Sequence, residues 1–187
     1  HYDTSFSLNK VERIAEEKTN APFGSTDNKQ QGSFGRVNRV HYFLVPVRGG
    51  VSKQIAQQYY VTEDIVKLYD YAFVNYVQEI KSYKRSGMKC PFYIRVEYKD
   101  NNKREFIGNL NDYIKGRAKS DKVLSMDDYE VDMTDLVKVL VENKDIINKI
   151  YCSEDNNITK RIFGIPFEEQ IKEAGLGEML APIIRPY

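Results

Sequence analysis

The chain has 187 residues, of which 41% are hydrophobic and 29% charged, with 28 Lys and Arg against 27 Asp and Glu. This length suits one domain with a single core, and the composition argues against both a membrane protein and a wholly disordered chain. No run approaches the roughly 18 apolar residues of a membrane-spanning helix, and the first residues form no signal segment, so we expect a soluble, cytoplasmic protein without a membrane partner.

Histidine and cysteine are scarce, which excludes several kinds of site. The sequence offers only His1, His41, Cys90 and Cys152, without the close spacing of a zinc site. We expect both cysteines to be reduced and partly buried, and His41 to be a hydrogen-bonded strand residue. No complete catalytic or cofactor motif is present. The sequence therefore predicts no catalytic residue, no metal and no cofactor, and it favours a binding protein over an enzyme.

Charge is distributed unevenly along the chain. Residues 28–122 carry 18 basic and 9 acidic side chains, whereas residues 123–187 carry 7 basic and 13 acidic ones. The basic segment indicates a surface for an anionic partner, with the acidic segment either facing away from that partner or shielding the surface. The alternative is that two oppositely charged halves of the chain dock on each other.

The N-terminal part reads as a helix, a linker and a strand. Apolar residues at helical spacing predict a helix over residues 7–18. The composition then changes to Asn, Gly, Ser and Gln, which predicts a loop or linker over residues 19–35. β-Branched and aromatic residues predict a strand over residues 37–47.

One motif lies inside this linker. Residues 32–37 read Gly-Ser-Phe-Gly-Arg-Val, which resembles the second half of the glycine-rich loop of protein kinases. Gln30 stands where the first glycine of that loop belongs, and the sequence contains neither His-Arg-Asp nor Asp-Phe-Gly. We therefore interpret the motif as a flexible loop that leads into a strand.

The strongest predicted element is a helix over residues 63–85. Thr62 can cap its start, and Gly87 follows its end. The apolar residues that predict its buried face, spaced three and four apart, are Val66, Tyr69, Phe73, Tyr76, Ile80 and Tyr83. We expect this helix to be the central core element, and we expect Phe73 and Tyr76 to be buried. The same pattern also fits a parallel coiled-coil dimer.

Strict alternation predicts a half-buried strand over residues 92–99, with a returning strand over residues 104–107. Near the end of the first strand, Glu97-Tyr98-Lys99 resembles the Glu-x-Lys of restriction-endonuclease-like nucleases, in which the carboxylate holds a divalent metal. The second carboxylate of such a site is missing, because Asp70 lies in the predicted helix. We expect a solvated polar face here rather than a nuclease.

The C-terminal part is predicted to be mainly helical. A second strong helix is expected over residues 133–151, followed by a loop over residues 153–157. Pro166 is expected to open a short helix that ends before Gly175. The tail from Leu176 onward is expected to pack as irregular chain.

Together these elements predict an α+β fold. A small antiparallel sheet of about three strands packs under one long and one medium helix, with a peripheral N-terminal helix and an irregular C-terminal tail. Residues 1–36 form an N-terminal helix and a linker rich in Gly, Ser and Asn. Residues 37–187 form a single α+β domain, which is basic over residues 37–122 and acidic and helical over residues 123–187.

The basic central surface is the strongest functional signal, because cations neutralise phosphates and exposed aromatic rings stack on bases. The residues predicted to bind nucleic acid are Lys81, Lys84, Arg85, Lys89, Lys103, Arg104, Tyr83 and Tyr93. We expect a non-enzymatic protein that binds nucleic acid or a nucleoprotein complex. A small inhibitor or adaptor, of the type that phages direct at defence nucleases, is the alternative; its acidic C-terminal region would bind a protein target. A metal-dependent nuclease is the third interpretation.

Overall fold

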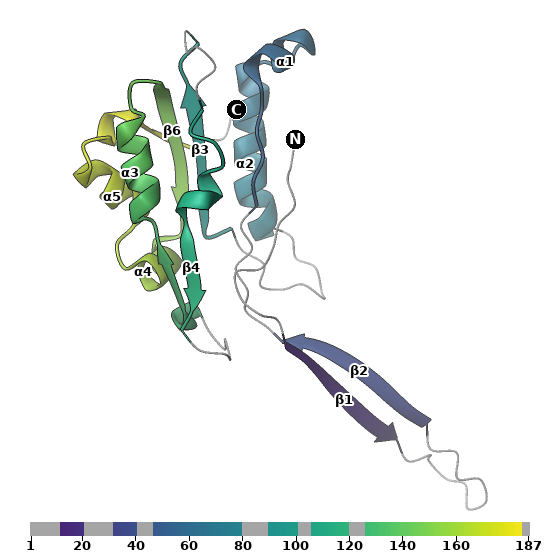
Figure 1. Ribbon diagram of the computed structural model, residues 1–187. Helices are drawn as coiled ribbons and strands as arrows, with labels where there is room; N and C mark the ends of the chain where they lie inside the picture. Colours follow the sequence, from purple (N-terminus) through teal and green to yellow (C-terminus); the bar gives the residue numbers. More distant parts are fainter. Residues whose placement is uncertain are drawn as a thin grey trace, which may run out of the picture.

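The computed structural model describes residues 12–20, 32–40, 47–79, 90–100, 106–119 and 126–184. The fold is α+β, with a small three-stranded sheet between helices (Figure 1). In chain order the elements are β1 (Glu12–Asn20), β2 (Gly32–Val40), α1 (Lys53–Gln58), α2 (Glu63–Glu79), β3 (Phe92–Tyr98), η1 (Leu110–Tyr113), β4 (Lys115–Ala118), η2 (Met126–Asp128), β5 (Tyr129–Asp132), α3 (Thr134–Glu142), β6 (Ile147–Glu154), α4 (Asn156–Phe163), α5 (Phe167–Glu173), η3 (Gly177–Met179) and β7 (Leu180–Pro182).

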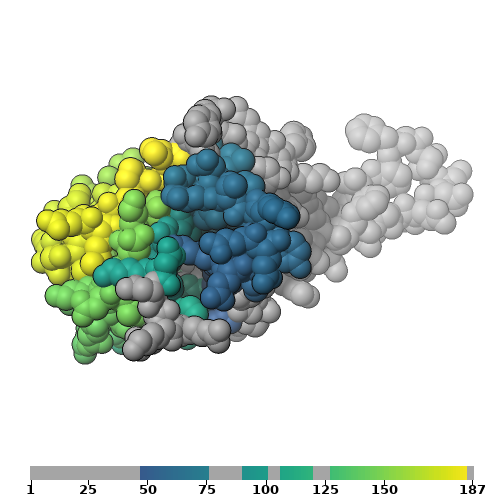
Figure 2. Space-filling view, turned by 90° about the horizontal axis from the view of Figure 1, so that it is seen from above, coloured from purple at the N-terminus to yellow at the C-terminus, as the bar shows by residue number. Residues whose placement is uncertain are grey.

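The central sheet has the strand order β3-β6-β7. β3 runs antiparallel to β6, with Ile94 opposite Cys152, and β7 runs parallel to the other edge of β6. β4 and β5 form a separate antiparallel pair, as do β1 and β2. In Figure 1, α2 lies on one side of the central sheet, and α3, α4 and α5 lie on the other. Figure 2 likewise shows α1 and α2 on the opposite side of the molecule from the C-terminal helices.

The hydrophobic core lies between the sheet and the C-terminal helices. Leu136 and Leu140 of α3, Ile150 of β6 and Phe167 of α5 are all fully buried there. Phe92 of β3 adds an edge-to-face contact with Phe167, at a centroid distance of 5.0 Å. Burial of this apolar surface is the main stabilising term of the fold, so α3, β6 and α5 form its centre.

Helix α2 contributes less to the core than its apolar pattern predicts. Phe73 is only half-buried, and its ring lies against Tyr93 of β3 at a centroid distance of 5.6 Å. Ile65 and Leu68 are about half exposed. The prediction of a central core helix is therefore wrong: the buried face of α2 is centred on Asp70 and Val74, and it covers the polar face of β3. The side chain of Tyr76 lies outside the described residues.

The N-terminal prediction also needs correction. Residues 12–18, predicted to be helical, belong to β1, and residues 32–35, predicted to be loop, belong to β2. The kinase-like motif of residues 32–37 is thus part of a strand. The ladder pairs Glu12 with Val40 and Asn20 with Gly32 over its full length. The hydrogen bonds of this ladder override the weak helical pattern of a short segment.

Three C-terminal predictions were wrong in part. The helix expected over residues 133–151 stops at Glu142, because residues 143–146 form a turn and the β-branched residues after it pair with β3 as strand β6. The loop expected over residues 153–157 instead contains the end of β6 and the start of α4, which Asp155 caps. The tail, expected to be irregular, adds β7 to the sheet. The short helix after Pro166 is confirmed as α5, and Gly175 follows it with φ of +78°.

The sheet has the predicted number of strands, but two of its members differ from the prediction. β3 matches the strand expected over residues 92–99, whereas β6 and β7 take the places expected for residues 37–47 and 104–107. Phe106 and Ile107 lie outside any strand, and residues 101–105 are outside the described residues. Among the described helices, none combines the length and the apolar character needed to cross a membrane.

Candidate functional site

A buried ion-pair cluster joins α2 to the polar face of the sheet. At its centre is Asp70 of α2, whose exposed fraction is only 2%. The guanidinium of Arg95 donates from Nε to Asp70 Oδ2 at 2.8 Å, and its Nη2 lies 2.8 Å from the same oxygen. The hydroxyl of Tyr93 donates to Asp70 Oδ1 at 2.8 Å. Because a buried carboxylate needs both a counter-charge and hydrogen bonds, these contacts account for an acidic residue on the inner face of α2.

Arg95 is held from two sides. Its guanidinium carbon lies 3.9 Å from the centroid of the Tyr151 ring of β6, which is the geometry of a cation–π contact. Burial opposes the charge of Arg95, but the hydrogen bond and the attraction of Asp70 outweigh it and raise the pKa of the guanidinium. Arg95 is therefore permanently charged, and it fixes α2 to β3 and β6.

Glu97 extends the cluster toward the end of β3. Asn148 Nδ2 donates to Glu97 Oε1 at 2.6 Å, and Lys53 Nζ lies 3.6 Å from that oxygen. Arg95 Nη1 lies 3.5 Å from Glu97 Oε2. Burial alone would raise the pKa of Glu97, but the Asn148 hydrogen bond and the two cations together lower it. Glu97 is therefore an anion with partners, and the prediction of a solvated face is wrong at this position.

This geometry bears directly on the nuclease interpretation. The missing second carboxylate is Asp70, which the fold brings to the same side of the sheet as Glu97 through the shared partner Arg95. A guanidinium therefore stands between the two carboxylates. Lys99 donates to the backbone oxygen of Asp145 at 2.9 Å. In the part of the chain that the structure describes, no group of three His, Cys, Asp or Glu side chains is arranged to hold a metal ion.

Of the eight residues predicted to bind nucleic acid, the structure describes one, Tyr93. Tyr93 lies under α2, half-buried, with its ring against Phe73 and its hydroxyl on Asp70. The other seven, and also His41, lie outside the described residues. The seven predicted residues are Lys81, Lys84, Arg85, Lys89, Lys103, Arg104 and Tyr83.

The basic residues of β4 dock on the acidic segment. Lys115 pairs with Asp135, and Arg117 pairs with Glu130 at 2.6 Å across the β4–β5 ladder. Lys119 donates to a backbone oxygen of the same acidic segment. Here the basic and acidic segments contact each other. This contact fits the alternative interpretation, in which the two oppositely charged parts of the chain dock on each other. These pairs are exposed, so each contributes little to stability.

The cysteines have no features of a nucleophile. Both are free thiols, and Cys152 is buried in β6. Burial raises the pKa of the Cys152 thiol far above its ordinary value and also raises that of Cys90. Because a reactive cysteine needs a thiolate near neutral pH, these residues are structural. The expectation of two reduced and at least partly buried thiols is confirmed.

Comparison with known proteins identifies the family. A family model described as CRISPR-associated protein Cas7 matches residues 2–134. The chain belongs to the Cas7 family. A curated relative is the CRISPR-associated protein Cas7 of Haloferax volcanii, which is 26% identical over 158 residues, covering 82% of this chain and 46% of the relative. The Cas7-family chain thus spans about half the length of this relative.

The Cas7 match contains both the buried cluster residues of α2 and β3 and the whole basic segment, and it ends where α3 begins. This sequence contains no complete catalytic or cofactor motif, so motif reading did not identify the family. Asp70 and its partner Arg95 were also missed as a pair. The available signal was an acidic residue within the apolar pattern of α2, one turn after Val66.

Proposed function

We propose that this Cas7-family chain binds nucleic acid within a CRISPR-associated complex, through the basic central segment and without catalysis of its own. The observation that carries the proposal is the coincidence of two ranges. The family match over residues 2–134 includes residues 28–122, whose net charge is +9, and excludes most of the acidic segment. The basic segment therefore lies wholly within the part of the chain that matches the family model.

The chemistry supports an RNA or an RNA–DNA hybrid as the partner. CRISPR effector complexes read their targets by base pairing with a guide RNA, and the protein holds the resulting heteroduplex by its backbone in a positively charged channel. Lys and Arg side chains neutralise phosphates without reading sequence. The cationic residues proposed to make these contacts are Lys81, Lys84, Arg85, Lys89, Lys103 and Arg104, and the proposed stacking residue is Tyr83. Tyr93 is not proposed for this role, because its ring packs against Phe73 and its hydroxyl binds Asp70.

Salt dependence of binding tests this proposal. We expect the chain to bind single-stranded RNA, with log affinity falling linearly as log salt concentration rises. The triple variant Lys81→Gln, Lys84→Gln, Arg85→Gln should reduce the slope by up to about 0.7 per lost phosphate contact on single strands and about 0.9 on duplex. Fluorescence anisotropy with labelled RNA, DNA and hybrid probes at several salt concentrations measures both quantities.

A matched control keeps the interpretation clear. The variant Lys144→Gln, Lys149→Gln, Lys160→Gln removes the same charge from exposed positions of the acidic segment, and it should leave the slope unchanged. If the salt slope is the same in both triple variants and in the unchanged protein, Lys81, Lys84 and Arg85 do not belong to the binding surface.

The other two interpretations receive less support. The comparisons give no support to a phage-type inhibitor. For a nuclease, the Arg95 guanidinium lies between the two carboxylates, and we expect no cleavage of RNA or DNA with magnesium or manganese. Metal-dependent cleavage that disappears in Glu97→Ala would overturn this ranking.

A further inference from the structure

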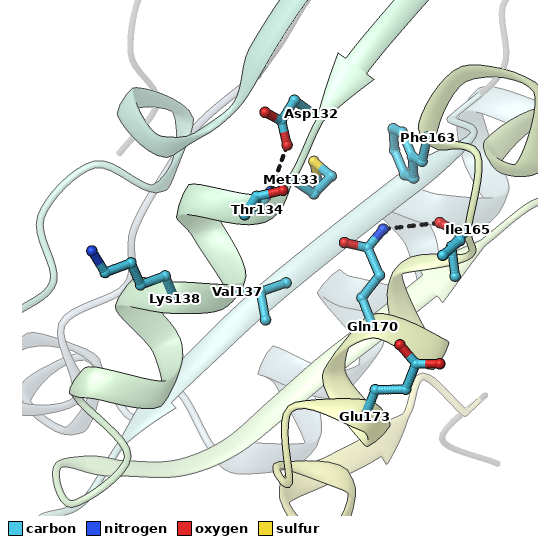
Figure 3. Close-up of a pocket in the computed structure, with 9 residues that line it drawn as sticks. All are labelled: Asp132, Met133, Thr134, Val137, Lys138, Phe163, Ile165, Gln170 and Glu173. Carbon is cyan, nitrogen blue, oxygen red and sulfur yellow. Dashed lines mark hydrogen bonds between the residues drawn. The ribbon is translucent and has the colours of Figure 1, made fainter.

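A groove lies between α3 and α5, on the opposite side of the sheet from the ion-pair cluster. Its volume is about 480 Å³. Figure 3 shows Val137 and Lys138 of α3 along one side and Gln170 and Glu173 of α5 along the other, with Phe163 and Ile165 near one end. The groove thus has an apolar interior and a polar rim, which is the usual composition of a ligand-binding site.

The apolar end of the groove is held in place by the turn between α4 and α5. Gln170 Nε2 donates to the backbone oxygen of Ile165 at 2.9 Å, and Gly164 takes a φ of +77° that allows the chain to reverse there. Phe163 is fixed by an edge-to-face contact with Phe92 at 5.3 Å. Ile165 is nevertheless 47% exposed. A hydrophobic side chain is therefore presented to solvent by a turn that is hydrogen-bonded to the next helix.

The α5 rim of the groove carries unbalanced negative charge. Glu173 lines the groove, and Glu169 lies one helical turn before it on the exposed side of α5, where like charges repel each other. Within the described residues neither has an ion-pair partner, since Lys172 pairs with Glu168 at 3.6 Å. On the other rim, Lys138 has its own partner in Glu142 at 3.9 Å. The α5 side of the groove is thus complementary to a cation, whereas the α3 side carries Lys138.

We propose that this groove binds a segment of another protein that places one or two apolar side chains in the groove and a Lys or Arg against Glu169 and Glu173. Nucleic acid fits poorly here, because its phosphates would meet the two carboxylates. The segment's apolar side chain would cover Ile165, while its cation would relieve the repulsion on α5. The site is separate from the basic segment, so it does not depend on the proposed nucleic-acid binding.

Two fluorescein-labelled peptides of equal apolar content test the proposal, one with Leu and Lys in alternation and one with Leu and Glu. We expect the full chain to bind the Lys peptide at least tenfold more tightly than the Glu peptide in anisotropy titrations. The double variant Glu169→Lys, Glu173→Lys should weaken the Lys peptide at least tenfold. Ile165→Ser should weaken it as well, by removing the apolar contact.

Controls match each change in kind. Asp64→Lys with Asp145→Lys alters charge equally at exposed positions away from the groove, and Ile184→Ser removes another exposed isoleucine. Both variants should bind as the unchanged chain does. Circular dichroism confirms that each variant is folded. Groove variants that bind like their controls would overturn the proposal. Sedimentation velocity gives the other decisive result: dimers of this chain that Ile165→Ser dissociates would mean that the occupant is a second copy.

Discussion

Burial of Asp70 illustrates how one charged side chain is accommodated between a helix and a sheet. Its carboxylate loses water, and the Arg95 guanidinium and the Tyr93 hydroxyl replace that hydration with direct hydrogen bonds. A pair of this kind is not necessarily stabilising relative to apolar residues of the same volume. Loss of a single partner, however, leaves the other buried without compensation.

We therefore expect Asp70→Ala to lower the free energy of unfolding by about 3–5 kcal/mol, since the half-buried Arg95 would lose its counter-charge. Urea denaturation followed by circular dichroism measures the change. Lys67→Ala is the control, because its pairs with Glu63 and Asp64 are exposed and should contribute little to stability. Similar losses in the two variants would show that the Asp70 pair is solvated in solution.

Glu97 gives the fold a dependence on acid pH. Its pKa in the folded chain is lowered from an ordinary 4.5, so its contribution to stability is present above that value and is lost as the pH falls through the folded pKa. We expect Glu97→Gln to flatten the decline of unfolding free energy below about pH 4.5. Urea midpoints at pH 3 to 6 test this. The control is Glu178→Gln, which should follow the unchanged chain.

At the scale of elements, the two helices that the sequence predicts most strongly differ in depth. Leu140 of α3 is fully buried, whereas Leu68 of α2 is 52% exposed. Leu140→Ala should therefore destabilise the chain by about 2–5 kcal/mol, and Leu68→Ala by much less than that. Thermal and urea denaturation of both variants provide the comparison. A large loss from Leu68→Ala would mean that the outer face of α2 is covered in solution.

The sequence pattern predicts elements better than it predicts their neighbours. Alternation in residues 92–98 identified β3 and its inward face, because a period of two has one structural interpretation. Ile147 and Ile150 fit a helical spacing equally well, and only pairing with β3 makes them a strand. The position of α2 was predicted wrongly because the pattern of apolar residues takes no account of Asp70. The burial of Asp70 depends on Arg95, which lies twenty-five residues away in the sequence. Such long-range partners leave no local signal.

At the scale of the whole molecule, charge divides the chain into two segments of opposite sign. The segment of residues 28–122 is basic, and the segment of residues 123–187 has a net charge of −6. Part of this difference is used internally, since Lys115 and Arg117 pair with Asp135 and Glu130. The cations proposed to bind phosphates belong to other parts of the basic segment. We therefore expect binding in the groove between α3 and α5 to be independent of nucleic-acid binding by the basic segment.

This separation predicts how the two surfaces respond to charge reversal. Interactions between exposed charges are largely screened beyond about 10 Å at 0.1 M salt. Glu169→Lys with Glu173→Lys should therefore leave both the affinity for RNA and its salt slope unchanged at that concentration. The measurement is the same anisotropy titration, with Asp64→Lys and Asp145→Lys as a control of equal charge. If the groove variant alone binds RNA more tightly and with a steeper slope, the acidic segment lies close enough to shield the basic one. The Lys peptide would then strengthen RNA binding, because its cation neutralises the same two carboxylates, and a titration of RNA into the chain saturated with the Lys peptide would detect this gain.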